Sequence, residues 1–471
     1  MSSNYNNLTE GPIFSKLVKM AIPIMATSFV QMAYNMTDMM WLGNLSSKAV
    51  ASVGSAAFLV WFGNSLGFLT KVGSEVSVSQ AIGRKDFTDA RNKASTSLLI
   101  AILIALSYTI IIQLFAPTLL SPFEFEDKSV LTNGVLYLRT VSLGFMFMYL
   151  NPTFTGIYNG AGVTKTPFYF NTIGLVVNII LDPMLIYGFG PFPAMEVKGA
   201  AIATVISQAL VGLLFVGSYI RGKFPIPDLK FKLINKFNDI KYVVKLGFPI
   251  ALHSALFAMI SFTISQLASK WGATAVAVMS VGAQIESVSW MTASGLSTAI
   301  GSFTGQNMGA GNLERIRKGY IYTFSMTLFV GLLATISFLF FGEEIFGQFI
   351  PEKEAVEYGV IYLKIIAYSQ IFMCVEIATA GTFNGLGKTI PPSVIGIVFT
   401  GARIPLAYLL TSAYSFGIVG IWWTVSSTTI IKGIIATVWV NYLLFRISCK
   451  DCKRTKFFSW MIPYRFRYRR Y

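Results

Sequence analysis

The sequence predicts an all-α polytopic membrane protein with twelve transmembrane helices, arranged as two six-helix lobes. Three observations lead to this fold class. The 471 residues are 54% hydrophobic and 12% charged, roughly half the charged fraction of a soluble globular chain. Long apolar runs recur along the whole chain, and each must be helical because hydrocarbon leaves no other partner for its backbone polar groups. The second half also repeats the first.

The repeat consists of short motifs that recur about 225 positions later. These are Asn159-Gly-x-Gly162 with Asn384-Gly-x-Gly387, and Gln80-x-x-Gly83 with Gln306-x-x-Gly309. Internal repeats within apolar sequence are typical of secondary transporters. Six spans per copy is an even number, so both copies enter the membrane in the same direction. We therefore expect a pseudo-two-fold axis along the membrane normal, with a cavity between the lobes.

Twelve spans can be placed in order along the chain. They cover approximately residues 17–43, 49–80, 92–120, 130–160, 167–189, 198–221, 243–269, 274–307, 317–348, 355–386, 391–413 and 417–445. Several exceed the ~20 residues needed to cross a bilayer, which predicts tilts, kinks or protrusion. The predicted domains are an N-terminal lobe (1–221), a cytoplasmic linker (222–242), a C-terminal lobe (243–446) and a basic cytoplasmic tail (447–471).

The basic residues are concentrated in the loops on one side of the predicted membrane. Lys and Arg gather between spans two and three, between six and seven, after eight and in the tail, whereas the loops after spans three and nine are acidic. The positive-inside rule then predicts a multi-pass protein of the cytoplasmic membrane with both termini inside the cell. Topology accounts for the net charge of +16, so we do not expect nucleic acid as a partner.

Enzyme motifs are absent from the sequence. There is no P-loop to bind ATP, and the single histidine, His253, has no recognisable nucleophile or metal-ligand set beside it. The three cysteines predict neither a zinc site nor a disulfide framework. We therefore expect no enzymatic activity and no cofactor. With ATP excluded as the direct energy source, the function that remains is transport driven by an ion gradient.

Among the acids inside predicted spans, two are the clearest functional candidates, because an ionisable group there is costly unless it faces a cavity or a partner. They are Asp38 and Asp182. Asn178 and Asp182 are four residues apart and so share one helix face, and Pro183 is predicted to kink that helix. With Thr204 on a small-residue helix, these oxygens suit an Na⁺ site or a protonatable switch. The alternative is a structural ion pair or a position outside the hydrocarbon.

Other polar residues within the predicted spans can be explained by structural roles as well as by functional ones. Gln31 and Tyr34 either line a cavity or join helices by hydrogen bonds. Lys71 and Glu75, four residues apart, are expected to pair with each other. In the second lobe the candidates are Glu286, Glu376 and Arg403, which either bind substrate or brace the lobe, and bracing is preferred.

From Lys16 to Arg446 the chain resembles the multidrug and toxic compound extrusion (MATE) family. The motifs that carry the resemblance are Pro23, Gln31-x-x-Tyr34-Asn35-x-x-Asp38, Gln80-x-x-Gly83, Asn159-Gly-x-Gly162-x-Thr-Lys-Thr-Pro167, Asn178-x-x-x-Asp182-Pro183 and Gly199-Ala-Ala-x-Ala-Thr204. The resemblance implies a V-shaped pair of lobes. It also implies export of amphipathic, often cationic compounds in exchange for Na⁺ or H⁺.

The chain further resembles the branch named after DNA-damage-inducible protein F. That resemblance implies a first-lobe coupling site at Asp38 and Asp182, with Asn178 and Thr204 as neighbours and Asn159 as a further member. No acid lies between Val243 and Ser269 in the seventh span, which favours first-lobe coupling. The coupling ion, H⁺ or Na⁺, stays open, and we expect a monomer in the lipid bilayer.

Two other functions compete. A lipid-linked oligosaccharide flippase of the same superfamily would need a strongly cationic central cavity, to which Lys71, Arg139 and Arg403 could contribute. A receptor or scaffold that transports nothing would need neither a duplicated six-span unit nor an acid beside a proline.

Overall fold

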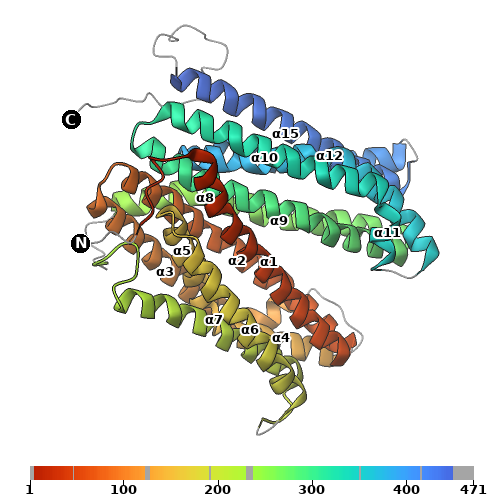
Figure 1. Ribbon diagram of the computed structural model, residues 1–471. Helices are drawn as coiled ribbons and strands as arrows, with labels where there is room; N and C mark the ends of the chain where they lie inside the picture. Colours follow the sequence, from red (N-terminus) through yellow and green to blue (C-terminus); the bar gives the residue numbers. More distant parts are fainter. Residues whose placement is uncertain are drawn as a thin grey trace.

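The computed structural model describes residues 5–45, 47–121, 128–189, 192–229, 237–349, 352–413 and 416–448. Within these ranges every regular element is a helix (Figure 1). Most of the predicted tail, residues 449–471, and part of the predicted linker, residues 230–236, lie outside the described residues.

The first half of the chain forms six spans from seven helices. They are α1 (Ile13–Leu45), α2 (Ser47–Gly83), α3 (Phe87–Leu120), α4 (Lys128–Ser142), α5 (Phe145–Gly160), α6 (Lys165–Tyr187) and α7 (Glu196–Ile220). The predicted span 130–160 is broken, because α4 and α5 meet at an angle of 50°. At the break, a Cβ on Gly144 would lie 2.8 Å from the Val205 side chain, so glycine lets α7 pack close to the bend.

The second half repeats this plan with additional short elements. It contains α8 (Phe237–Ala268), a 3₁₀ turn (Ser269–Trp271), α9 (Ala273–Gly309), α10 (Leu313–Phe340), α11 (Gly342–Gly347), α12 (Lys353–Gly385), α13 (Ile390–Gly401), α14 (Arg403–Tyr408), a π-helical turn (Leu409–Ala413) and α15 (Ile418–Ser448). The predicted span 391–413 is thus interrupted at Ala402. Pro405 explains the interruption, because it has no N–H to donate to the carbonyl of Gly401 four residues earlier.

Eleven of the twelve predicted spans pass a test of length and apolar composition within the described residues, with the bent α4–α5 pair counted as one. The remaining span, α9, is long enough but less apolar. It packs against α1 and α2 of the first lobe and α10 and α12 of its own. Because protein covers α9 on several sides, it does not need the lipid-facing composition of the other spans.

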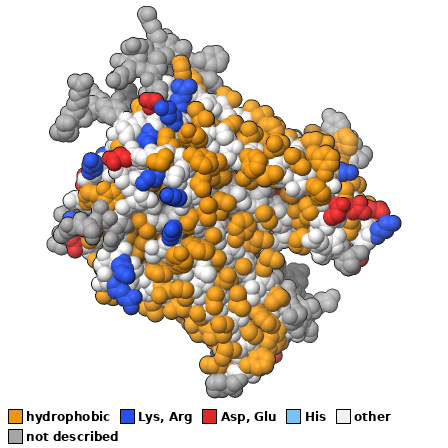
Figure 2. All heavy atoms as spheres, in the orientation of Figure 1, with side chains coloured by type: hydrophobic (Ala, Val, Ile, Leu, Met, Phe, Trp, Pro, Cys, Tyr) orange, Lys and Arg blue, Asp and Glu red, His pale blue; other side chains and the backbone are white. Residues whose placement is uncertain are grey.

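Charged side chains mark the two ends of the bundle. Figure 2 shows Lys and Arg gathered over one end and a cluster of acids at the other, beside α11, with a hydrophobic surface between them. We call the end where α2 and α9 terminate the basic end. The two lobes lie close together there and spread apart toward α4 and α11 (Figure 1).

Two glutamines join the lobes at the basic end by reciprocal hydrogen bonds. Nε2 of Gln80, on α2, donates to the carbonyl of Gly385 at 2.9 Å, and Nε2 of Gln306, on α9, donates to the carbonyl of Gly160 at 3.0 Å. Gly160 and Gly385 are the last residues of α5 and α12, whose terminal carbonyls have no partner within the helix. Each lobe therefore caps a helix of the other, and we call this pair of contacts the glutamine clasp.

The clasp requires α2 and α9 to touch backbone to backbone. A Cβ on Gly83 would lie 1.9 Å from the carbonyl oxygen of Gln306, and a Cβ on Gly309 would lie 2.1 Å from that of Gln80. No side chain fits at either position without separating the helices. The repeated Gln-x-x-Gly motifs of the sequence therefore form one of the contacts between the two repeats.

The segment before α1 strengthens the same junction. The buried Leu8 donates its N–H to Oε1 of Gln306 at 2.9 Å, and its carbonyl accepts from Nδ2 of Asn307 at 3.2 Å. The N–H of Asn6 donates to the carbonyl of Ala161 in the first lobe at 2.8 Å. The segment thus connects both lobes at the basic end.

Gly83→Ala tests the close approach at the clasp. We expect a lower melting temperature in detergent, because the added methyl group would meet the Gln306 carbonyl. Gly217→Ala, in α7, is the matched control, since nothing lies within 4 Å of its Cβ position. Alanine there should leave stability unchanged or raise it by up to ~1 kcal/mol through helix propensity. Equal melting temperatures for the two variants would contradict the required contact.

Candidate functional site

The first-lobe acid Asp182 lies on α6 and is fully buried, as is Asn178 one turn earlier. Nδ2 of Asn178 donates to Oδ1 of Asp182 at 3.1 Å. A buried ionised carboxylate is costly, because hydrogen bonds within the protein replace only part of its lost hydration. The pair is therefore a place where binding of a proton or a cation changes the free energy of the lobe.

Tyr34 and Thr204 join the neighbouring helices of this lobe. The buried Tyr34, on α1, donates its hydroxyl to the backbone carbonyl of Thr204, on α7, at 3.4 Å. The hydroxyl of Thr204 donates to the carbonyl of Ala200 at 3.0 Å. Since α1, α6 and α7 also pack against one another, the predicted residues Tyr34, Asn178, Asp182 and Thr204 belong to one three-helix unit.

Three further predicted residues relate differently to this unit. The backbone of Asp38 lies within α1, but its side chain is outside the described residues. Gln31 is exposed on α1. Pro183 lies in the last turn of α6, which continues to Tyr187, so the kink at Pro183 stays a prediction.

Asn159 lies in a second polar region, between the lobes. A cavity of about 50 Å³ is lined by Ile24, Thr27, Ser28, Lys71, Thr155, Asn159, Pro167, Ser294 and Thr298, which come from both lobes. Its wall residue Pro167 lies fifteen residues before Asp182 on α6, or roughly 22 Å along the helix axis. The structure thus groups Asn159 with Lys71 rather than with Asp182.

Lys71 and Glu75 attract each other electrostatically but do not form the direct ion pair that their spacing suggests. None of the described ion pairs joins these two residues. Instead Oε1 of Glu75 accepts from the hydroxyl of Ser302, on α9 of the other lobe, at 3.1 Å. Spacing four apart places both side chains on one helix face, but the partner from the second lobe decides where the carboxylate points. Lys71 is consequently a cavity residue, a position that the sequence suggested only under the flippase alternative.

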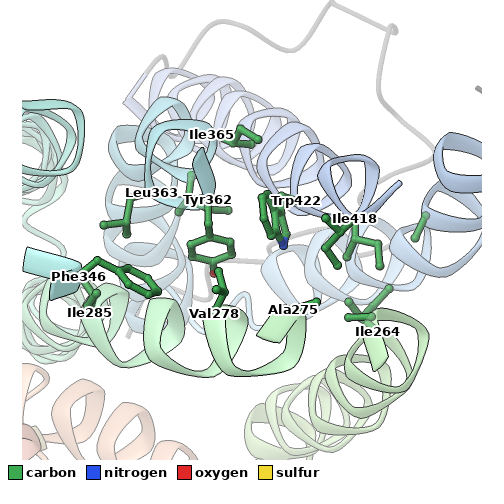
Figure 3. Packing of buried hydrophobic residues seen from close by; sticks show 14 of the residues in the cluster. Ile264, Ala275, Val278, Ile285, Phe346, Tyr362, Leu363, Ile365, Ile418 and Trp422 are labelled. Carbon is green, nitrogen blue, oxygen red and sulfur yellow. The ribbon is translucent and has the colours of Figure 1, made fainter. Parts of the chain in front are cut away.

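In the second lobe, Glu286 is held by hydrogen bonds. The hydroxyl of Tyr362 donates to its Oε1, and Nε2 of Gln370 donates to its Oε2 at 3.4 Å. The ring of Tyr362 packs edge-on against the fully buried Trp422 in the core of this lobe (Figure 3). Glu286 is therefore tied to the hydrophobic core through a rigid aromatic side chain.

Glu376 and Arg403 also have partners within the second lobe. Glu376 pairs with Lys432 at 3.3 Å, and both side chains are at most 14% exposed. The guanidinium of Arg403 donates to the hydroxyls of Thr428 at 3.0 Å and Thr429 at 2.9 Å, on α15. These contacts join α12 and α14 to α15, and they favour the interpretation that the second-lobe charges brace the lobe.

Lys432→Met tests that interpretation. It leaves the carboxylate of Glu376 buried without its partner, so we expect the free energy of unfolding to fall by about 3–5 kcal/mol, with transport per folded molecule retained. Lys318→Met is the control, because the ion pair of Lys318 with Glu314 is exposed and its loss should not be measurable. Unchanged stability with lost transport would contradict bracing.

Comparison with known proteins agrees with this fold. Residues 23–184 and 249–409 match the MatE family. A probable multidrug resistance protein NorM of Thermotoga maritima is 29% identical over 426 residues, which cover 89% of this chain and 90% of the relative. An FAD transporter of Shewanella oneidensis is 24% identical over 462 residues, covering 96% and 98%.

Solved structures show the same architecture. A crystal structure of a MATE protein in complex with MaL6 superimposes with a TM-score of 0.88 at 21% identity, covering 95% of this chain and 99% of that one. The similarity supports the twelve-helix, two-lobed fold. The two family matches together cover more than half of the chain, one in each repeat, so the protein belongs to the MatE family and is a membrane transporter rather than an enzyme.

Proposed function

We propose that the protein is a cation-coupled antiporter that exports amphipathic, often cationic organic compounds by alternating access. Its relatives named as multidrug resistance proteins support the substrate class. The observation that carries the coupling proposal is Asp182, a carboxylate with no exposed surface inside a membrane-spanning helix, bound by Asn178. Intramembrane acids of this kind mark proton relays and ion pathways.

Burial explains how this acid drives a conformational change. Ionised Asp182 favours a polar, hydrated first-lobe cavity, whereas a bound proton or Na⁺ lowers the cost of enclosing it in apolar surroundings. The oxygens proposed to receive Na⁺ are those of Asp38, Asn178, Asp182 and Thr204, since Na⁺ is a hard cation like those that prefer oxygen ligands. The same carboxylates serve for H⁺. Bending of α6 near Pro183 would then close the cavity and release substrate.

The glutamine clasp supplies the second part of the proposed mechanism. The distribution of Lys and Arg supports a basic end that faces the cytoplasm of the cell, with both termini on that side. In this structure the clasp holds that end shut. Loading substrate from the cytoplasm then requires Gln80 and Gln306 to release the carbonyls of the opposite lobe. The two lobes would then rotate as rigid bodies about the cavity between them.

The flippase alternative has less support. Of its three basic candidates only Lys71 lines the cavity between the lobes. Arg139 is exposed, and Arg403 is bound by threonines inside the second lobe. The buried Asp182 and the lack of an acid in the core of α8 support instead a coupling site in the first lobe, as in the DNA-damage-inducible protein F branch. We further propose that the protein acts as a monomer.

Asp182→Asn tests the coupling site. The purified variant in liposomes should no longer export a fluorescent organic cation when a pH gradient or an Na⁺ gradient is imposed, each tested separately. The reason is that an amide neither takes up a proton nor carries a negative charge to bind Na⁺. Glu343→Gln neutralises one exposed acid and should retain full activity. The gradient that drives the wild-type protein identifies the ion. Full gradient-driven efflux by Asp182→Asn, at normal protein levels, would refute the assignment.

A further inference from the structure

Lys71 brings a positive charge into the cavity between the lobes. It lies on α2, and its Nζ is 5.5 Å from the centre of the Phe68 ring. The other polar cavity walls are the hydroxyls of Thr27, Ser28, Thr155, Ser294 and Thr298 and the amide of Asn159. No acidic side chain is among the described residues that line the cavity. The hydroxyls of Thr27, Ser28 and Thr155 donate to backbone carbonyls of their own helices. The donors that can serve a ligand beside the ammonium group are the hydroxyls of Ser294 and Thr298 and the amide of Asn159, and such a set is suited to an anion.

Nearby acids do not occupy this position. Glu75 lies close enough to attract Lys71 electrostatically, but its carboxylate accepts from Ser302 across the lobe interface. Asp182 lies roughly 22 Å farther along α6 than the cavity wall at Pro167. The cavity between the lobes and the Asn178–Asp182 pair within the first lobe are therefore separate sites.

Comparison of the two repeats shows that helix packing does not require a lysine at position 71. With the 226-residue offset of the glutamines, Ser297 is the counterpart of Lys71. The geometry agrees, because a Cβ on Gly156 would lie 2.3 Å from the carbonyl of Lys71, and a Cβ on Gly381 would lie 2.1 Å from that of Ser297. Both repeats make the same helix contact, one with a lysine and one with a serine. The charge is thus an addition to the first lobe that packing does not explain.

We propose that Lys71, with the hydroxyls of Ser294 and Thr298 and the amide of Asn159, forms a subsite for an acidic group, a carboxylate, on the exported compound. The inference rests on the proposed export function and narrows its substrate class to amphipathic compounds that carry an acidic group, including zwitterions. A cavity of about 50 Å³ is large enough for such a group but not for a whole drug molecule. The remainder of the compound extends from the subsite along the lobe interface.

The test compares two xanthene dyes that differ only at one position, a free carboxylate in one and its methyl ester in the other. Binding to the purified full-length protein in detergent is measured by fluorescence anisotropy. Wild type should bind the carboxylate dye about tenfold more tightly, as one good charge-assisted contact provides. Lys71→Gln should abolish the difference, and Lys71→Arg should keep most of it. Lys364→Gln removes an exposed lysine of α12 and should change nothing.

Two results would overturn the subsite. These are equal affinities of wild type for both dyes, or a loss in Lys71→Gln that is the same for the acid and the ester. Melting temperatures close to wild type, together with rescue by Lys71→Arg, exclude misfolding as the cause. Binding needs no ion gradient, so a failure of gradient-driven efflux alone contradicts the antiporter proposal, whereas a failure of acid preference contradicts the subsite.

Discussion

The reciprocal capping of helix ends by Gln80 and Gln306 is the contact on which the arrangement of the lobes depends. Each glutamine donates to the last carbonyl of a helix in the other lobe, and that carbonyl has no partner within its helix. Glycines where α2 and α9 cross allow the two backbones to meet. Because the contact is made twice by equivalent residues, it couples the lobes symmetrically. Hydrogen bonds of this kind contribute about 1 kcal/mol each, so the junction is specific yet weak enough to open during transport.

Much of the fold could be predicted from the sequence, because hydrocarbon allows only helices and because the repeat fixed the relation between the halves. The internal breaks could not be predicted equally well. At the bend, the need for glycine at position 144 comes from Val205, which lies on a different helix, so local sequence carries little sign of it. The break at Ala402 had a local cause in Pro405. Polarity of α9 follows from its burial among helices of both lobes.

The candidate site was predictable only where its partners share a helix. Asn178 and Asp182 face each other as their spacing predicts. The same rule did not predict the hydrogen-bond partner of Glu75, because Ser302 approaches from the other lobe. Similarly, the pairing of Glu376 with Lys432 joins α12 to α15, and no sequence spacing predicts it. Differences between the two repeats pointed both to the Asn178–Asp182 pair and to the cavity between the lobes. Asp182 and Lys71 each occupy a position at which the second repeat has an uncharged residue.

We propose that the two parts of the mechanism are linked, so that the state of Asp182 controls opening at the glutamine clasp, because alternating access requires the two sides to open in turn. A distance measurement tests this link most directly. Spin labels at Arg84 and Ala310, exposed residues just beyond the ends of α2 and α9, report the separation of the lobes in a variant without native cysteines. The account predicts that this distance changes with pH or Na⁺ when Asp182 is present and stays constant in Asp182→Asn. The same change in both proteins would contradict the claim.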